Sequence, residues 1–303
     1  MPSMTKFETL QRYQLIEVLL QWEGEFCSNH LCEYFGLGRP QVSKIVKSYQ
    51  NDISDTNFTY CNTRKRHLAS ASFTPYLTQG KVDEYLDFVQ RLSAHNTTAV
   101  HNVFCLPNAE FLPMPRFALE PEIFKGINRA IANNLRIDVD YRSVNAPNKD
   151  GRIIVPHAIA HSGVRWHVRA YCEKNQDFRD FVLTRFVGEV IEEGPATIDS
   201  TEDINWHTMV GVVIVPHPYL TEAQQAVVAR DYGMTDGQRV LTVRASLLTY
   251  LLKMLQLNLT DDAPDSTQDE AEFEVLSKED KQQIGKAKQV MVANREALQR
   301  WGF

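Results

Sequence analysis

Basic and aromatic residues alternate along segment 164–186, VRWHVRAYCEKNQDFRDFVLTRF. We interpret the segment as two strands, with a polar turn from Glu173 to Asp177 between them. Successive side chains of a strand point to opposite faces, so this pattern gives the first strand one basic face and one apolar face. The basic face carries Arg165, His167, Arg169 and Tyr171, and the apolar face carries Trp166, Val168, Ala170 and Cys172.

The second strand is expected from Phe181 to Phe186 and adds Arg185. A face with several arginines is not needed to build a core, and the whole chain has a net charge of −6. We therefore predict that this face binds an anion, because guanidinium groups pair with phosphate or carboxylate oxygens. The alternative is a solvated sheet face whose arginines have ordinary partners.

Two short helices in the N-terminal region are expected to bind DNA. The first spans Asn29–Phe35 with Ser28 as its cap, and the second spans Arg39–Tyr49 after the turn Gly36-Leu37-Gly38. Val42, Ile45, Val46 and Tyr49 recur at helical spacing, which predicts a buried face opposite a basic one. This is a helix-turn-helix arrangement, whose second helix enters the major groove. The alternative is a helical hairpin with a solvated lysine face. The residues expected to contact DNA are Ser28, Arg39, Pro40, Gln41, Ser43, Lys44 and Lys47.

A basic hairpin follows the two helices and favours the DNA-binding interpretation. We expect strands at 56–60 and 67–73, joined by a turn at 61–66 that places Arg64, Lys65 and Arg66 at the tip of a wing. Residues 36–70 include six basic and two acidic residues, which gives a local charge of +4. From residue 203 to the end, 10 basic and 14 acidic residues give −4. A basic patch at one end of an acidic chain is the electrostatic pattern of a nucleic-acid interface.

These segments together carry a family resemblance. Trp166-His167-Val168 stands where WYL domains have their Trp-Tyr-Leu motif, and Tyr141, Pro156, Phe181 and Arg185 fit the same pattern. With its N- and C-terminal regions the whole chain resembles the WYL-domain transcription regulators. It is most similar to the BrxR/CapW-like repressors that adjoin bacterial phage-defence operons. The chain departs from the family at Gly38, where a serine usually precedes the recognition helix.

The resemblance implies an α+β multidomain fold. The expected parts are a winged helix-turn-helix domain (1–77), a helical linker (78–117), a WYL ligand-sensing domain built as an SH3-like β-barrel (118–200), and an α/β WCX dimerisation domain (201–303). We expect helices at 6–22, 78–92 and 121–132, and an irregular connector at 95–115. In the WYL domain, strands are expected at 136–143 and 152–156. In the last domain we expect strands at 210–215 and 239–244, helices at 221–231 and 246–255, an acidic loop at 261–270 and one helix from 278 to 301.

The resemblance also implies the effector site. The residues expected to line it are Tyr141, Ser143, His157, Arg165, His167, Arg169 and Arg185. Such a set suits a nucleotide or a single-stranded nucleic acid, because arginines pair with phosphates and aromatic rings stack on bases.

Metal binding and catalysis have little support in the sequence. His157, His161 and His167 lack the spacing of a zinc site, and the five cysteines form no CxxC pair. Cys172 falls on the face opposite His167, so a nucleophile with its base is not assembled there. We predict no metal, no cofactor and no enzymatic activity.

The predicted function is that of a homodimeric repressor that binds double-stranded DNA at an inverted repeat and responds to an anionic effector. The alternative is a WYL accessory protein that regulates a partner or an enzyme without binding an operator. The sequence has no signal peptide and no run of about 18 apolar residues. We therefore expect a cytoplasmic protein with reduced thiols and no membrane partner.

Overall fold

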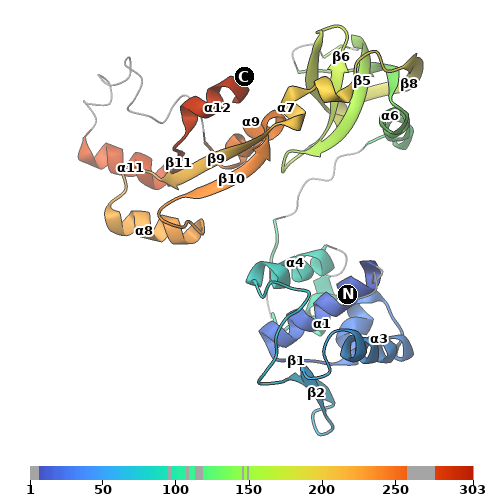
Figure 1. Ribbon diagram of the computed structural model, residues 1–303, viewed down its shortest axis with the longest axis vertical. Coiled ribbons are helices and arrows are strands. Elements are labelled where there is room, and N and C mark those ends of the chain that lie inside the picture. The colour runs from blue at the N-terminus through green and yellow to red at the C-terminus, as the bar shows by residue number, and fades with distance from the viewer. Residues whose placement is uncertain are drawn as a thin grey trace. The chain divides into compact units, whose positions relative to one another are not determined.

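A computed structural model describes residues 7–94, 97–106, 109–112, 119–144, 147–148, 150–257 and 277–302. The chain forms two compact units, Met1–Pro113 and Met114–Phe303, which we describe separately (Figure 1). The elements of the first unit are α1 (Phe7–Glu23), β1 (Glu25–Phe26), α2 (Ser28–Phe35), α3 (Arg39–Asp52), β2 (Phe58–Cys61), β3 (Arg66–Ala69), α4 (Val82–Ser93) and α5 (Thr97–Val103). Its three strands form an antiparallel sheet in the order β1-β3-β2.

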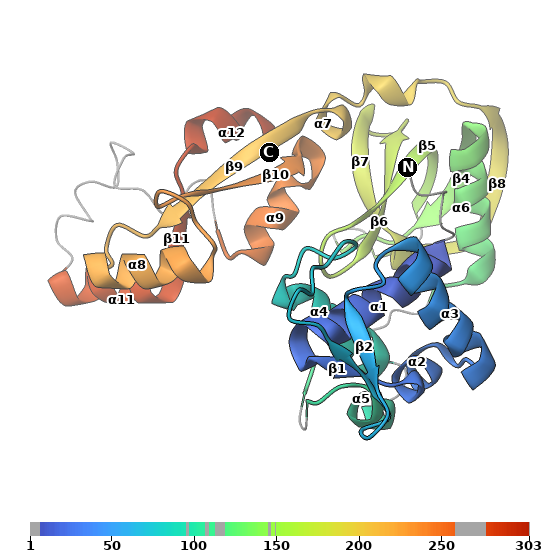
Figure 2. The same cartoon turned by 60° about the horizontal axis from the view of Figure 1, so that its bottom comes forward.

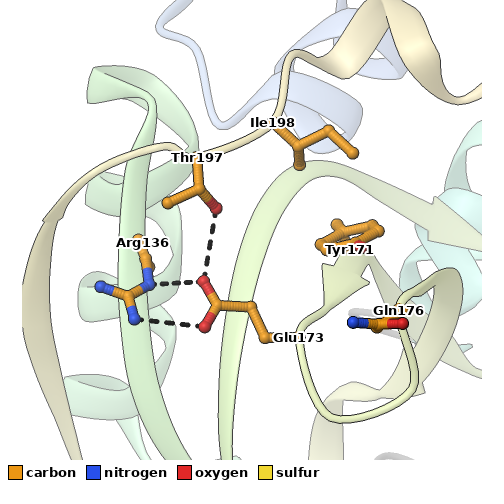
Figure 3. A pocket seen from close by; sticks show the side chains of 6 residues that line it. All are labelled: Arg136, Tyr171, Glu173, Gln176, Thr197 and Ile198. Carbon is orange, nitrogen blue, oxygen red and sulfur yellow. Dashed lines mark hydrogen bonds and ion pairs between the residues drawn. The ribbon is translucent and has the colours of Figure 1, made fainter.

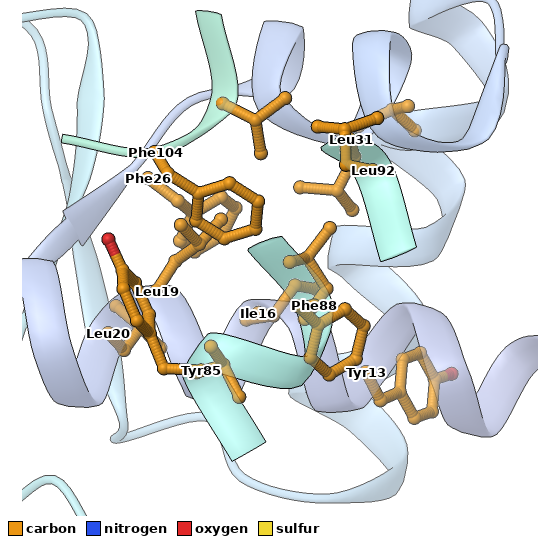
Figure 4. Close-up of a cluster of buried hydrophobic side chains, with 14 of the residues drawn as sticks. Tyr13, Ile16, Leu19, Leu20, Phe26, Leu31, Tyr85, Phe88, Leu92 and Phe104 are labelled. Carbon is orange, nitrogen blue, oxygen red and sulfur yellow. The ribbon is translucent and has the colours of Figure 1, made fainter. Parts of the chain in front are cut away.

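The first unit has a single hydrophobic core to which the linker helices contribute. Ile16 and Leu19 of α1 pack with Leu31 of α2 and with Phe88 of α4, and Phe104 closes the cluster after α5 (Figure 4). The prediction of an irregular connector at 95–115 is therefore wrong in part, because Thr97–Val103 is helical. Helices α4 and α5 belong to the core of the winged helix, since both bury apolar side chains in it.

A buried polar network fixes α3 to the rest of this unit. The carboxylate of Glu17, which is 0% exposed, accepts a hydrogen bond from the Tyr49 hydroxyl at 3.1 Å. The same carboxylate accepts the backbone N–H groups of Tyr76, Leu77 and Thr78 at 2.9–3.0 Å. A buried carboxylate is tolerated only when its oxygens are hydrogen-bonded, so these bonds hold the segment after the wing against α1 and α3.

The second unit begins with the expected helix and a five-stranded antiparallel sheet. Its elements are α6 (Pro121–Asn133), β4 (Leu135–Tyr141), β5 (Asp150–His161), β6 (Trp166–Cys172), β7 (Asp177–Val182), a 3-10 turn (Leu183–Arg185) and β8 (Phe186–Pro195). The strand order is β7-β6-β5-β4-β8. The sequence located four of these strands and not β8, and within the described ranges no ladder joins β7 to β8 to close a barrel. Strand β5 extends to His161, beyond the predicted end at residue 156.

Helix α6 lies against β4, β5 and β8 (Figure 2). Ile123 and Ile127 are buried there, and Gly126 lets the helix come close to β8, because a Cβ at that position would lie 2.8 Å from Cβ of Val190.

The predicted second strand at 181–186 is wrong in its bounds. A 3-10 turn at Leu183–Arg185 separates β7 from β8, so the alternation expected through Arg185 is interrupted.

The C-terminal part of this unit contains a 3-10 turn (Ser200–Glu202), α7 (Ile204–His207), β9 (Met209–Pro216), α8 (Glu222–Asp231), β10 (Arg239–Arg244), a 3-10 turn (Ala245–Leu247), α9 (Leu248–Met254), α11 (Lys278–Lys288), β11 (Val290–Val292) and α12 (Arg295–Gly302). The strand order is β10-β9-β11, with both pairs antiparallel. The prediction of one helix from 278 to 301 is wrong. Gln289 has φ +47, and β11 separates the two helices. The predicted acidic loop at 261–270 lies outside the described residues.

Candidate nucleic-acid interface and effector surface

Helix α3 exposes the basic face that its periodicity predicts. Val42, Ile45, Val46 and Tyr49 are buried in the core of the first unit. The side chains of Arg39, Pro40, Gln41, Ser43, Lys44 and Lys47 are all exposed. Among the described residues no carboxylate pairs with Lys44 or Lys47. Both charges are therefore available to an external anion.

The N-terminus of α3 is fixed by side-chain contacts that the sequence did not reveal. Gln41 Oε1 accepts a hydrogen bond from the Gly38 N–H at 3.2 Å, which supplies the capping interaction that glycine lacks. Arg39 Nη2 donates to Asn29 Oδ1 of α2 at 3.3 Å. The expected cap at Ser28 is wrong, because Ser28 is the first residue of α2 and Cys27 holds the capping position. Ser28 is half-buried.

The wing is present, and an unexpected carboxylate lies beside it. Strands β2 and β3 pair from Phe58↔Ala69 to Cys61↔Arg66, so the tip is formed by residues 62–65 and Arg66 lies in the strand. The predicted position of Arg66 at the tip is therefore wrong. Glu25 of β1 pairs with Arg64 at 2.8 Å and with Arg66 at 3.4 Å. Lys65 is exposed at the tip with φ +52.

In the second unit, the basic face of β6 is largely covered. His167 is 4% exposed and Arg169 is 6% exposed, whereas Arg165 is exposed. Val168, Ala170 and Cys172 are buried on the opposite face as expected, but Trp166 is 53% exposed. Both faces of β6 are therefore buried over most of the strand. The alternation predicted correctly which side chains share a face, but it predicted only in part which side chains are exposed.

A carboxylate from the C-terminal part covers this face. Arg169 Nε donates to Asp203 Oδ2 at 2.7 Å, and its Nη2 donates to Asp203 Oδ1 at 2.9 Å. His157 Nε2 lies 2.9 Å from Asp203 Oδ2. Asp203 is 1% exposed, and burial alone raises the pKa of its carboxyl group. The hydrogen bonds from His157 and Arg169 outweigh that effect and hold the pKa well below its usual range.

A second carboxylate and a tyrosine complete the contact. Arg169 Nη1 donates to Asp180 Oδ1 of β7 at 3.3 Å, and burial raises the pKa of Asp180. The Tyr250 hydroxyl of α9 is hydrogen-bonded to Asp180, and the Tyr250 ring lies 4.8 Å from the His167 ring. Asp203 and Asp180 are 34 and 11 residues away from Arg169. No local sequence signal could have paired them with it.

Among the described residues beside this face, Arg165 is exposed and Arg185 is half-buried, and the exposed Arg142 follows the last residue of β4. Burial lowers the pKa of His167, and the nearby charges of Arg165 and Arg185 lower it further, which places both arginines close to this ring. The Arg142 N–H donates to the Arg185 carbonyl at 3.0 Å. Within the described part of the chain, none of the three has an ion-pair partner. The sequence pattern did not single out Arg142, because it follows the last residue of β4.

The other predicted effector residues lie in different surroundings. Tyr141 is 6% exposed in the core of the sheet, where its hydroxyl accepts the Val182 N–H at 3.0 Å. Ser143 is half-buried just beyond β4. Of the seven predicted residues, the structure thus places Arg165, His167 and Arg185 together. It holds Arg169 and His157 in a salt-bridged cluster and Tyr141 in the core.

A shallow pocket opens at the far end of β6 (Figure 3). It is lined by Arg136, Tyr171, Glu173, Gln176, Thr197 and Ile198. Arg136 donates to both oxygens of Glu173, and the Thr197 hydroxyl also donates to this carboxylate. The pocket's own ion pair neutralises its arginine, and none of the seven predicted effector residues lines it. It is therefore a poorer anion site than the surface around Arg165 and Arg185.

The geometry gives no support to a metal site or a nucleophile. Among the described residues there is no group of three or more potential metal ligands from His, Cys, Asp and Glu. Cys172 is 0% exposed, with its thiol against the Asn175 side chain. The three histidines considered as a metal set make different contacts: the His161 ring packs on Trp166, and His157 is hydrogen-bonded to Asp203. Within the described ranges, no helix has both the length and the apolar content to span a membrane.

Comparison with known proteins assigns families to the three parts of the chain. Residues 8–91 match the BrxR transcriptional regulator winged helix-turn-helix domain, residues 122–189 match the WYL domain, and residues 209–282 match the BrxR transcriptional regulator C-terminal dimerization domain. The chain is 34% identical over 262 residues to the DNA-binding transcriptional repressor CapW of Pseudomonas aeruginosa, covering 84% of each chain.

It is 33% identical to CapW of Stenotrophomonas maltophilia, covering 84% of this chain and 85% of that one. A solved structure, proteasome accessory factor B/C of Arthrobacter aurescens, covers 97% of this chain and 47% of that chain. It shares 16% identity at a TM-score of 0.27, a value that supports no argument about the fold. The identity to CapW over most of the chain, together with the three domain matches, shows that the chain belongs to the BrxR/CapW family of WYL-domain transcriptional repressors, a family of regulators and not of enzymes.

Proposed function

We propose that this protein is a homodimeric repressor that binds an inverted-repeat operator through α3 and the wing. The observation that carries this proposal is the exposed face of α3, with Arg39, Lys44 and Lys47 on a helix whose opposite face is buried. A helix fits the major groove, where arginine reads base edges and lysines neutralise phosphates. The relatives CapW are named as DNA-binding transcriptional repressors, which agrees with this use of the face.

In the dimer, two copies of α3 would contact half-sites about 34–36 Å apart, which is one turn of DNA. Helices α4 and α5 share the core of the winged helix, so they would move with it as one body. The family resemblance further suggests that the controlled locus is a phage-defence operon.

The effector is proposed to be an anion, either a nucleotide or a single-stranded nucleic acid. It would bind to the guanidinium groups of Arg165 and Arg185, with His167 beside them. Arg142 would be a further candidate, because its backbone N–H is bonded to the Arg185 carbonyl. Arg169 and His157, already bound to Asp203, would connect this surface to the C-terminal part of the chain. The effector must have different affinities for two conformations of the dimer, since equal affinity would shift nothing.

A gel-shift titration of the full-length protein tests the operator proposal. The probes are the DNA immediately upstream of its own gene and a scrambled duplex of the same composition, each at two salt concentrations. We expect selective binding to the upstream DNA and a steep loss of affinity with salt, because phosphate contacts release counterions. A folded protein that binds neither duplex would contradict the operator proposal and favour the accessory role for the WYL domain.

A further inference from the structure

The C-terminal sheet has one face that the core covers. Val210, Val212 and Ile214 of β9 are 8%, 0% and 1% exposed. They belong to a hydrophobic cluster with Leu248 and Leu252 of α9 and Leu298 of α12. Leu241 and Val243 of β10 point to the same side and pack against this cluster. One side of the sheet is therefore the interior of the C-terminal part.

The other side of this sheet, which we call the outer face, follows from the strand register. In an antiparallel pair, directly opposite residues share a face. Gly211 is opposite Thr242, Val213 is opposite Val240, and Val215 is opposite Met291. The outer face consists of Met209, Gly211, Val213 and Val215 of β9, Val240, Thr242 and Arg244 of β10, and Met291 of β11.

The outer face is apolar where a solvated face should be polar. Met209 is 54% exposed and Val240 is 55% exposed. None of its five large apolar side chains belongs to the hydrophobic cluster or packs against it. Its one ionisable residue, Arg244, is engaged at the end of the sheet, with Nη1 donating to the Trp206 carbonyl at 2.5 Å and the guanidinium 4.7 Å from the Trp206 ring.

An antiparallel sheet with a solvated second face normally alternates apolar and polar residues. Charged residues make up 23% of this chain, yet no Asp, Glu or Lys stands on the outer face. An apolar sheet face of this kind marks an interaction surface.

The centre of the outer face is also flat. A Cβ at position 211 would lie 3.1 Å from Cγ1 of Val240, so the glycine leaves the Val240 side chain room to lie over the strand. No side chain stands up from β9 between Met209 and Val213, which lets another apolar surface approach the backbone closely. A flat apolar face is suited to packing against a copy of itself, because a two-fold interface uses the same patch on both subunits.

We propose that the outer face of the β10-β9-β11 sheet is the dimer interface, occupied by the same face of a second copy of this chain. The region from residue 209, the first residue of β9, to residue 282 matches a C-terminal dimerization domain. The outer face is the apolar, uncharged surface that β9 and β10 present within that region. This inference rests on the proposed homodimer and assigns the residues that hold it together.

Charge placed on the outer face tests the inference directly. We would measure the molar mass of the full-length protein by light scattering after gel filtration, for the unmodified chain, Val240→Glu and Met209→Glu/Val240→Glu. Burying an unpaired carboxylate is costly, so we expect the unmodified chain to be a dimer and the double variant a monomer. The matched control is Val227→Glu on α8. Val227 is 60% exposed and lies outside this face, so its replacement should leave the dimer intact.

A cross-linking measurement covers the case in which a glutamate variant fails to fold. Thr242→Cys places a thiol on the outer face, and Val227→Cys places one elsewhere in the same part of the chain. Under a mild oxidant we expect a covalent dimer on a non-reducing gel for Thr242→Cys and none above background for Val227→Cys or the unmodified chain. A dimer that persists in Met209→Glu/Val240→Glu, with no cross-link through Thr242→Cys, overturns the inference.

The measurements also separate this inference from the proposed function. A monomeric unmodified chain would contradict both the outer-face inference and the homodimer. A dimeric chain that binds no operator would contradict the repressor proposal alone. In that case the glutamate and cysteine variants would still decide which face holds the dimer.

Discussion

The two basic faces of this molecule look alike in sequence and differ in structure. On α3, Lys44 and Lys47 stand exposed, with no carboxylate paired to them among the described residues. On β6, Arg169 is buried and shared between Asp203 and Asp180. Periodicity predicts which residues share a face of a helix or a strand, and it did so in both places. Whether that face is open depends on what another segment places over it.

The difference has energetic consequences because burial changes what a charge contributes. Exposed charges on α3 cost little to maintain and remain available to a ligand. The guanidinium of Arg169 has lost water and depends on its two carboxylates, so removing one partner leaves an uncompensated buried charge. Basic side chains are therefore expected to bind DNA on α3 and to stabilise the folded state on β6.

The largest expected effect is that of Arg169→Ala on stability. Loss of this guanidinium leaves Asp203 and Asp180 buried without their main partner, and we expect the second unit to lose about 3–5 kcal/mol of unfolding free energy. Urea unfolding followed by tryptophan fluorescence measures this, because Trp166, Trp206 and Trp301 all lie in that unit.

The control for this prediction is Arg165→Ala, which removes an exposed guanidinium from the same strand face and should change stability by less than about 0.5 kcal/mol. Adding Asp203→Asn to Arg169→Ala should recover part of the loss, since it removes one stranded charge. Equal stabilities for Arg169→Ala and Arg165→Ala would mean that Arg169 is as open as the cations of α3.

The next effect concerns pH and the one buried histidine of α2. His30 is 6% exposed, and burial, together with the nearby charge of Arg66, lowers its pKa from 6.5 to about 4. Between these values the unfolded chain binds a proton that the folded chain does not. The first unit should therefore be fully stable above pH 6.5 and lose about 3 kcal/mol as the pH falls to 4.

The urea midpoint of the first unit at pH 7 and at pH 5, followed through Trp22, checks the sign of this effect. His30→Leu should reduce the difference between the two midpoints, because leucine does not titrate. If the unmodified chain and His30→Leu lose the same stability between pH 7 and pH 5, proton binding by His30 is not responsible.

Substitutions on α3 should affect DNA binding and leave stability unchanged. We expect Arg39→Ala to weaken operator binding by about 1–3 kcal/mol, which is roughly fivefold to 150-fold, if it reads a base edge. Lys44→Ala should weaken binding to all duplexes alike and reduce the salt slope by about 1, since it removes one phosphate contact. The control is Lys125→Ala on α6, an exposed lysine of the second unit. Unchanged binding by both α3 variants would show that this exposed face is not the DNA interface.

Much of the fold was predictable because its signals are local. Helix α6 begins at Pro121 and β10 spans Arg239–Arg244 as the sequence pattern predicts, since capping residues and alternation act over a few positions. The predictions that failed concern local features that leave no signal in the sequence. Gln289 has a positive φ and breaks the final helix, and glutamine gives no sign of that conformation. The two-residue strand β1 is too short to show a period.

The site was predictable only where no distant segment contributes. The exposed residues of α3 follow from one helix and its own buried face. The partners of Arg169, by contrast, come from β7 and from the segment before α7, and a bidentate ion pair leaves no spacing pattern when its two residues lie 34 positions apart. Arg142 was missed because it lies beyond the end of a strand, where alternation no longer assigns a face.

The smallest expected effect tests the wing, whose arginines are intermediate between the exposed lysines of α3 and the buried, ion-paired Arg169 of β6. Glu25 is half-buried and pairs with Arg64, which is largely exposed, and with Arg66, which is half-buried. An ion pair of this kind contributes about 0–1 kcal/mol, so Glu25→Gln should leave the fold intact and make both guanidinium groups available to phosphates. We expect operator affinity to rise by about twofold to fivefold and the salt slope to steepen, in a titration of both proteins at several salt concentrations.

Asp83→Asn, which removes an exposed carboxylate at the start of α4, is the control for a general change in charge and should have a smaller effect. An unchanged slope for Glu25→Gln would mean that the wing arginines do not reach the DNA backbone. A steeper slope would mean that a carboxylate within the domain limits DNA binding by the wing. The arginines of the wing would then resemble Arg169 in having a carboxylate partner and resemble the lysines of α3 in being accessible to DNA. Because the Glu25 ion pairs are partly exposed, DNA phosphates can take the place of the Glu25 carboxylate.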